Sequence, residues 1–241
     1  MVHQIIQKLI AYYSRDFFTE PILLLTFICS CVIGLLYNYR QKERILFVIY
    51  FFAGALLFLL ASPVEVALTV AGRNADIFNE ACNTTFEIAE FTAFQYFFKK
   101  SLRNEKFKKI SNIFFLLFAA ICVIFLAALG FPGYPKEAIR EHSFLINVLE
   151  FFLLAFLCLA YFYELFTDAP KMNLFERPSF FITTSVFFYS VLLIPFFIIA
   201  RALSKDEQSI FFVLFACHYL LLIIVLIAVS KGFLCAKLIT T

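Results

Sequence analysis

Four acidic residues of this chain lie inside long apolar stretches, where a carboxyl group is costly. Glu65, Glu87, Glu90 and Glu150 each have apolar residues close by on both sides. A carboxylate at the centre of a bilayer costs at least ~2.5 kcal/mol on insertion scales. Such groups usually face the protein interior, have a partner there and mark a site for a ligand, an ion or a proton. These residues therefore define a candidate site.

The most polar of these stretches has helical spacing. Asn79, Asn83, Glu87 and Glu90 follow the pattern i, i+4, i+8, i+11, which predicts one polar stripe along a helix. The same pattern predicts that Glu80 points away from the stripe, towards the lipid headgroups. We expect the stripe to face the interior of a helical bundle.

Polar residues of other apolar stretches are predicted to meet this stripe. With a helical rise of 1.5 Å per residue, Asn83 and Glu87 of the stripe lie at a similar depth to Glu65, Glu150 and His218, about 9 to 16 Å below one membrane surface. The predicted ligand-binding residues are Glu65, Asn83, Glu87, Glu90, Asn147, Glu150, Tyr189 and His218.

This cluster has three interpretations, and the sequence leaves all three open. The first is a pocket for a small polar or cationic ligand. The second is a metal site with Glu87, Glu150 and His218 as ligands, whose oxygen-rich chemistry would favour Fe or Mn over structural Zn. The third is purely structural, with protonated carboxyls and amides forming hydrogen bonds between helices. No cofactor is identified by the sequence.

The composition requires a lipid environment. Of the 241 residues, 63% are hydrophobic and 15% are charged, and the mean hydropathy is +0.92. A soluble domain has about half apolar and about a quarter charged residues. The formal net charge of +3 is too small to indicate a nucleic-acid partner. The lipid bilayer is the expected partner.

Apolar stretches of this length predict an all-α, polytopic fold, because a helix needs about 20 residues to cross a bilayer. We expect seven transmembrane helices, at about residues 21–39, 45–71, 76–98, 111–130, 144–167, 178–202 and 209–231. Ser62-Pro63 should kink the second. The predicted domains are an amphipathic interfacial helix at 1–20, the bundle at 21–232 and a short cytoplasmic tail at 233–241.

Basic residues set the expected orientation. The densest group lies between the third and fourth spans and comprises Lys99, Lys100, Arg103, Lys106, Lys108 and Lys109. The positive-inside rule places this loop in the cytoplasm, with the N-terminus outside and the C-terminus inside. The loop could attract anionic lipid, worth ~1 kcal/mol per charge near the surface, or dock a cytoplasmic protein. Glu164, near the inner end of the fifth span, could pair with a basic residue there.

The layout of residues 20–232 resembles bacterial seven-helix membrane sensor modules associated with histidine kinases. The stretch Arg177 to Tyr189, RPSFFITTSVFFY, looks like the start of their sixth span, with Phe181 where an aromatic residue, often Trp, is usual. The resemblance implies signal transduction in the plasma (inner) membrane of a bacterium. No kinase domain follows Thr241, so signalling would need a separate cytoplasmic partner such as a histidine kinase.

The leading hypothesis is a sensory or receptor-like module that binds a small ligand in an outward-facing polar pocket and signals to a cytoplasmic partner. The first alternative is an ion-coupled small-solute transporter. Carriers often show inverted repeats and broken helices, whereas no repeat is evident here and Pro63 and Pro195 are the only mid-span breaks. The second alternative is an intramembrane metal-dependent enzyme. The sequence leaves enzymatic activity uncertain and favours its absence, because no hydrolase, metalloprotease or phosphate-binding motif occurs.

Overall fold

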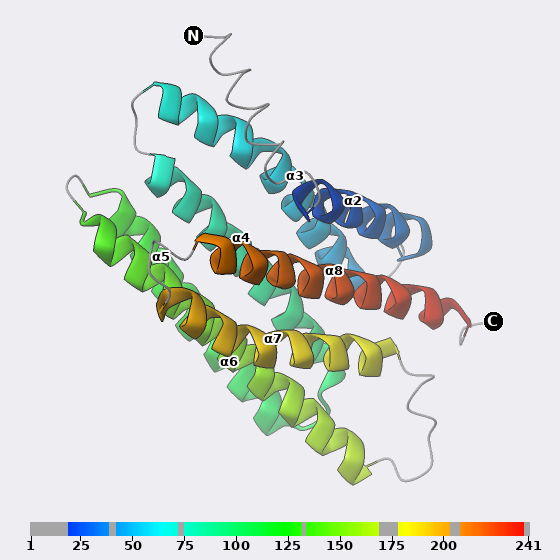
Figure 1. Cartoon of the computed structure of the whole chain (residues 1–241). Helices are drawn as coiled ribbons and strands as arrows, with labels where there is room; N and C mark the ends of the chain where they lie inside the picture. The colour runs from blue at the N-terminus through cyan, green and yellow to red at the C-terminus, as the bar shows by residue number, and fades with distance from the viewer. Residues whose placement is uncertain are drawn as a thin grey trace.

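In the computed structural model, every described element is an α-helix (Figure 1). The structure describes residues 19–38, 42–71, 75–131, 134–168, 178–202 and 208–238. Its helices are α2 (Thr19–Asn38), α3 (Lys42–Val70), α4 (Ala75–Ser101), α5 (Glu105–Leu129), α6 (Lys136–Asp168), α7 (Pro178–Ala202) and α8 (Gln208–Leu238). The predicted all-α fold is confirmed, and each helix overlaps one predicted span.

The structure describes little of the predicted N-terminal helix and most of the predicted C-terminal tail. The predicted amphipathic helix lies outside the described residues, apart from the two residues that begin α2. The predicted tail at 233–241 is helical as far as Leu238, because α8 continues beyond the predicted end of the last span.

Side-chain capping and proline mark the starts of two helices, and two further prolines lie inside helices. The Asn104 side chain caps α5 by accepting the backbone N–H of Lys106 at 2.9 Å. Pro178 is the first residue of α7, where its missing N–H costs nothing. Helix α3 runs through Pro63 without interruption, and α7 runs through Pro195 in the same way.

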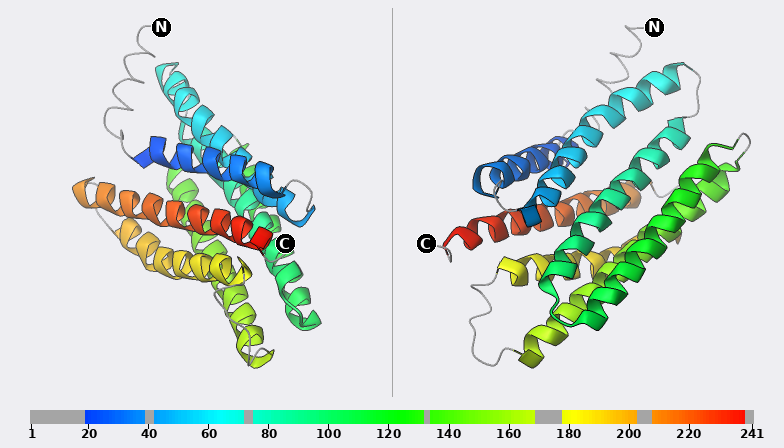
Figure 2. Two further views of the ribbon diagram at one scale, coloured as in Figure 1. Left: turned by 90° about the vertical axis from the view of Figure 1, so that its right-hand side faces the viewer. Right: turned by 180° about the vertical axis from the view of Figure 1, so that it is seen from behind.

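Six of the helices form a closed ring. Around it, α2 packs on α3, α3 on α4, α4 on α6, α6 on α7, α7 on α8, and α8 on α2. The fifth helix, α5, lies outside this ring against α4 and α6. Helix α8 lies between α2 and α7, and these three cross the other helices obliquely (Figures 1 and 2). The interior of the ring collects residues from helices that are far apart in the sequence.

Aromatic rings fill much of the space between the helices. The ring of Phe27 on α2 lies with its centroid 5.9 Å from those of both Tyr50 on α3 and Phe86 on α4. Gly54 of α3 makes room for Phe27, because a Cβ at Gly54 would lie 2.5 Å from the Phe27 ring. The α2–α3 contact therefore combines a large aromatic ring with a glycine, a small residue of the kind that often lies between membrane helices.

Three described segments are long and apolar enough to cross a membrane: Glu105–Leu129, Glu137–Thr167 and Ser179–Ile199. Shorter apolar segments lie in α2, α3 and α8: Ile22–Leu36, Leu46–Leu57 and Ala216–Lys231. The described part of α4 has no such segment, because its carboxyls and amides interrupt the apolar sequence. The described residues thus support an integral membrane protein with three candidate spans, not the seven predicted.

The outer face of α5 supports this conclusion. Five large aliphatic side chains on this helix are between 50% and 69% exposed: Ile113, Leu116, Leu117, Val123 and Ile124. A contiguous apolar face of this size is unusual for a protein surrounded by water. Lipid chains are its natural surroundings.

Candidate functional site

Helices α4 and α6 run side by side in the same direction. Near their starts, Glu80 faces Ser143, and further along Glu87 faces Asn147. Beyond the end of α4, the backbone of Arg103 reaches Glu164 of α6. The number of residues in the sequence between the two partners changes little from one pair to the next. The same face of α4 therefore lies along the same face of α6 from one end to the other.

A row of polar side chains on α4 leads from the surface into the ring. Asp76, Glu80, Thr84, Glu87 and Glu90 are four, four, three and three residues apart, so they share one face of the helix. Asp76 is exposed and Glu80 is half-buried, whereas the other three are buried. The row therefore descends from the start of α4 to the middle of the bundle.

A second row on α6 faces the first. It consists of Ser143, Asn147 and Glu150, spaced one helical turn apart. The Asn147 amide donates to the backbone carbonyl of Ser143 at 2.9 Å and lies within reach of the Glu87 carboxyl. We call these two rows the polar seam.

The polar seam ends at three buried carboxyls, which we call the acidic centre. Glu87, Glu90 and Glu150 are 7%, 3% and 1% exposed. Each of the first two carboxyls is close enough to Glu150 to interact with it electrostatically. Two helices thus hold three acidic groups together inside the protein.

Two tyrosines and a histidine border the acidic centre. The buried hydroxyl of Tyr50 on α3 faces Glu90, and the buried Tyr189 on α7 lies within electrostatic range of Glu90 and Glu150. The His218 ring on α8 lies 6.1 Å from the Tyr189 ring, centroid to centroid, and stacks on Phe196 at 5.7 Å. His218 thus adjoins the centre through aromatic contacts.

Several polar atoms of this region are buried with no hydrogen-bond partner among the described protein atoms. They are Tyr50 Oη, Glu80 Oε2, Thr84 Oγ1, Glu87 Oε2, Glu90 Oε1 and Glu150 Oε1. Buried polar atoms in proteins nearly always bond to protein, water or a ligand. Within the described residues, the groups that act on the three carboxyls are acids, an amide and phenols, with no Lys or Arg. This chemistry suits a cation, a proton or water.

The geometry does not favour the predicted metal site. Among the described residues, no group of three or more His, Cys, Asp and Glu side chains is arranged to hold a metal ion. Glu87 and Glu150 lie near each other, but the ring of His218 packs against aromatic rings instead of joining them.

The structure brings together five of the eight predicted ligand-binding residues: Glu87, Glu90, Asn147, Glu150 and Tyr189. His218 adjoins them, as described above. Glu65 lies apart and accepts a hydrogen bond from Asn79 Nδ2 at 3.1 Å. Asn83 is exposed.

The predicted stripe is therefore wrong at Asn83, whereas Asn79 meets Glu65 as predicted. Thr84 is buried where Asn83 was expected, and Glu80 faces α6 instead of the headgroups. Tyr50 and Asp76 belong to this region and were not predicted from the sequence. A search for hydroxyls at three- and four-residue spacing from Glu87 would have found Thr84.

Beyond the acidic centre most of the buried side chains of α4 and α6 are apolar, with Gln95 of α4 as a buried polar exception. Phe91, Phe94 and Phe98 of α4 and Leu154 and Leu157 of α6 are all at most 1% exposed. These five residues form what we call the apolar block. The polar seam reaches the acidic centre from the Asp76 end, and the apolar block follows the centre along both helices.

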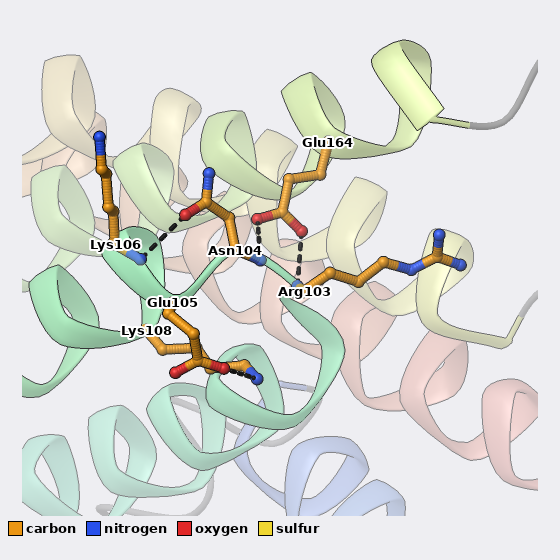
Figure 3. A network of polar contacts seen from close by, with 6 residues as sticks. All are labelled: Arg103, Asn104, Glu105, Lys106, Lys108 and Glu164. Atoms are coloured by element: carbon orange, nitrogen blue, oxygen red, sulfur yellow. Dashed lines mark hydrogen bonds and ion pairs between the residues drawn. The ribbon is translucent and has the colours of Figure 1, made fainter.

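The far ends of α4 and α6 are joined by Glu164 (Figure 3). Its buried carboxylate accepts the backbone N–H of Arg103 at 2.7 Å and that of Asn104 at 2.9 Å. The expected pairing with a basic side chain is not what holds Glu164 here, and the Arg103 side chain extends away from it.

The predicted basic loop surrounds this junction. Lys99, Lys100, Arg103, Lys106 and Lys109 are exposed, whereas Lys108 is half-buried and pairs with Glu105 at 2.8 Å. We call this group of residues the basic end. It lies at the opposite end of α4 from Asp76.

Comparisons with protein-family models, with curated protein sequences and with solved structures find no significant match to this chain. Its class is therefore defined by its own structure: an all-α protein with apolar helices of membrane-spanning length around a buried acidic centre.

Proposed function

We propose that this chain is a membrane-embedded, receptor-like sensor module that binds a small cation at the acidic centre and signals to a cytoplasmic partner. The observation that supports this most directly is the acidic centre itself. No Lys or Arg among the described residues acts on its three buried carboxyls. A buried carboxylate without a counter-charge is strongly disfavoured, and a bound cation supplies that charge.

The polar seam supports sensing over transport. It connects the exposed Asp76 to the acidic centre, and the apolar block separates that centre from the basic end. A receptor needs access from one side only. An ion-coupled transporter, the alternative function, would have to open the apolar block in a second conformation.

We also propose that the chain crosses the membrane seven times, with its N-terminus outside, in a bacterial plasma membrane. The parallel course of α4 and α6, with α5 connecting them, is what three successive crossings produce. The apolar segments of α2, α3 and α8 lie in the same ring. Helix α4 need not be apolar all round, because its carboxyls face the interior.

The path of the signal follows from the same two helices. Both α4 and α6 continue without a break from the acidic centre to the hydrogen bonds that Glu164 accepts from the backbone of the basic end. A ligand shifts a conformational equilibrium when it binds one state more tightly than the other. A cation that changes how α4 packs on α6 would thereby move the basic end, where we place a cytoplasmic partner such as a histidine kinase. The resemblance to seven-helix sensor modules motivates this choice of partner.

The proposal is tested on the purified chain in lipid nanodiscs. Inorganic cations, organic ammonium ions and pH are varied in turn, and hydrogen exchange of residues 99–109 and thermal stability are measured. A ligand at 100 times its Kd stabilises the bound state by about 2.7 kcal/mol. The midpoint temperature of thermal unfolding should therefore rise, and the rate of hydrogen exchange at the basic end should change.

Two variants give the control. Glu150→Gln removes a carboxyl of the acidic centre and should abolish both responses. Glu137→Gln makes the same change at an exposed position of the same helix and should leave them intact. The proposal fails if no cation and no pH change alters exchange at the basic end, or if Glu150→Gln responds like the unmodified chain.

A further inference from the structure

The chemistry of the polar seam narrows the identity of the cation. We infer that the acidic centre binds protons, and that they reach it from the Asp76 end along the polar seam. This inference rests on the proposed function, because it names the ligand of the same site. It goes beyond that function by assigning the path and the residues that form it.

The first argument is charge. Glu87, Glu90 and Glu150 are buried within interaction distance of one another. Three carboxylates this close repel each other strongly in a low-dielectric interior. A proton shared among them removes that repulsion and occupies almost no volume.

The second argument is geometry. A metal ion needs several ligands converging at about 2 Å, and no such group exists among the described His, Cys, Asp and Glu side chains. A proton needs only one carboxyl oxygen and a neighbour that shares it. The hydroxyl of Tyr50, which faces Glu90, is a suitable neighbour.

The third argument is the order of groups along α4. Asp76, Glu80, Thr84 and Glu87 are three or four residues apart, a rise of about 4.5 to 6 Å per step. Each can both accept and donate a proton through a carboxyl or hydroxyl group. Three of them carry a buried oxygen with no described partner, and an ordered water can bridge neighbours at this spacing.

Among the described residues, no Lys or Arg near the acidic centre would compete for this role. The titratable and amide groups around the acidic centre come from six helices. They are Tyr50 of α3, Glu80 of α4, Cys122 of α5, Asn147 of α6, Tyr189 of α7 and, through Tyr189, His218 of α8.

Infrared difference spectroscopy tests the binding of protons directly. The chain in nanodiscs is titrated with acid, and the carbonyl stretch of protonated carboxylic acids is followed. We expect a buried component of this band that is lost in Glu87→Gln and in Glu150→Gln and kept in Glu137→Gln. If all three variants retain the full band, the acidic centre does not take up protons and the inference is wrong.

A matched pair of variants tests the path. Thr84→Val removes a buried hydroxyl from the middle of the polar seam while keeping its shape. Thr85→Val removes an exposed hydroxyl that bonds to the Ala81 carbonyl at 2.7 Å, outside the seam. After a rapid pH drop, Thr84→Val should slow growth of the carboxylic-acid band by about tenfold, equivalent to about 1.4 kcal/mol on the barrier. Equal rates in the two variants would refute the proposed path.

The two proposals fail in distinguishable ways. If another cation changes exchange at the basic end and the infrared band does not depend on Glu150, the proton inference fails and the sensor proposal stands. If the band depends on Glu150 and the basic end never responds to pH or to any cation, the site binds protons and the sensor proposal fails.

Discussion

The carboxylate of Glu164 accepts the backbone N–H of Asn104 at 2.9 Å, which joins the last part of α6 to the first turn of α5. The adjacent N–H of Arg103 donates to the same carboxylate at 2.7 Å. These donors sit at the start of a helix, where unsatisfied N–H groups carry partial positive charge. One buried acidic side chain therefore orders the basic end through the backbone.

Replacing Glu164 should loosen the basic end. In Glu164→Ala the N–H groups of Arg103 and Asn104 lose a charged acceptor in two part-buried hydrogen bonds, and a hydrogen bond to a charged group contributes about 1.5–3 kcal/mol. We expect a lower free energy of unfolding and faster hydrogen exchange at these two amides. Denaturant titration and exchange mass spectrometry measure the two effects.

An intermediate variant and a control variant accompany Glu164→Ala. Glu164→Gln keeps one acceptor oxygen and should fall between the unmodified chain and the alanine variant. Glu105→Gln breaks the exposed ion pair with Lys108 and should leave exchange at Arg103 and Asn104 unchanged. Unaltered exchange in Glu164→Ala would mean that another contact holds the loop.

Helix α4 shows why its buried face could be predicted only in part. The predicted stripe has a spacing of about 3.7 residues per turn and passes through Asn79 and Asn83. The buried face of α4 instead follows the 3.5-residue repeat of closely aligned helices, and Thr84, Glu87, Phe91, Phe94 and Phe98 all lie on it. The predicted stripe and the observed buried face share Glu87, and they separate on both sides of it.

The positions of the helices were predictable for a different reason. Length and apolarity alone locate a helix in lipid, and the sixth predicted span, residues 178–202, has the observed bounds of α7. The number of crossings was harder to predict. Helix α4 is long enough to cross a membrane, but its carboxyls make its composition too polar for a typical span. Tyr50 was missed because it lies among Phe and Ile residues, and only the packing of α3 on α4 brings it to Glu90.

The contact between α2 and α8 closes the ring and can be trapped by a disulfide. Ser230 donates to Ser30 with an Oγ–Oγ distance of 2.9 Å. This places the two Cβ atoms close to the separation of about 3.5–4.5 Å that a disulfide requires. With the seven native cysteines replaced, Ser30→Cys/Ser230→Cys should crosslink on mild oxidation, as judged by gel mobility after cleavage between the two helices.

Position 29 provides the control for this crosslink. Cys29 is exposed, and it points about 100° away from Ser30 around the helix. A variant with only Cys29 and Ser230→Cys should not crosslink. Equal crosslinking in both variants would show that α2 rotates freely and that the ring is not closed as described.

A methyl group at Gly54 should separate α2 from α3. In Gly54→Ala the new Cβ would lie 2.5 Å from the buried ring of Phe27. Overpacking of this kind costs about 1–3 kcal/mol, which thermal unfolding in nanodiscs should detect. Gly130→Ala meets its nearest atom at 3.3 Å and should cost less, and Phe27→Leu combined with Gly54→Ala should recover stability. Equal stability of the two single variants would contradict the close approach at Gly54.

The number of crossings is decided by labelling three exposed positions with a membrane-impermeant maleimide. In the cysteine-free background, Asp76→Cys, Lys106→Cys and Glu137→Cys lie at the start of α4, the start of α5 and the start of α6. Helix α5 is about 37 Å long, enough to cross a hydrocarbon core of about 30 Å. We therefore expect positions 106 and 137 to label from opposite sides of the membrane.

Position 76 separates seven crossings from three. If α4 crosses, Asp76→Cys labels from the same side as Glu137→Cys, and both react in intact cells whereas Lys106→Cys reacts only in inverted vesicles. If α4 does not cross, Asp76→Cys and Lys106→Cys react from one side. That result would place the acidic residues of α4 beside the membrane and would contradict a sensor that receives its ligand on one side and signals on the other.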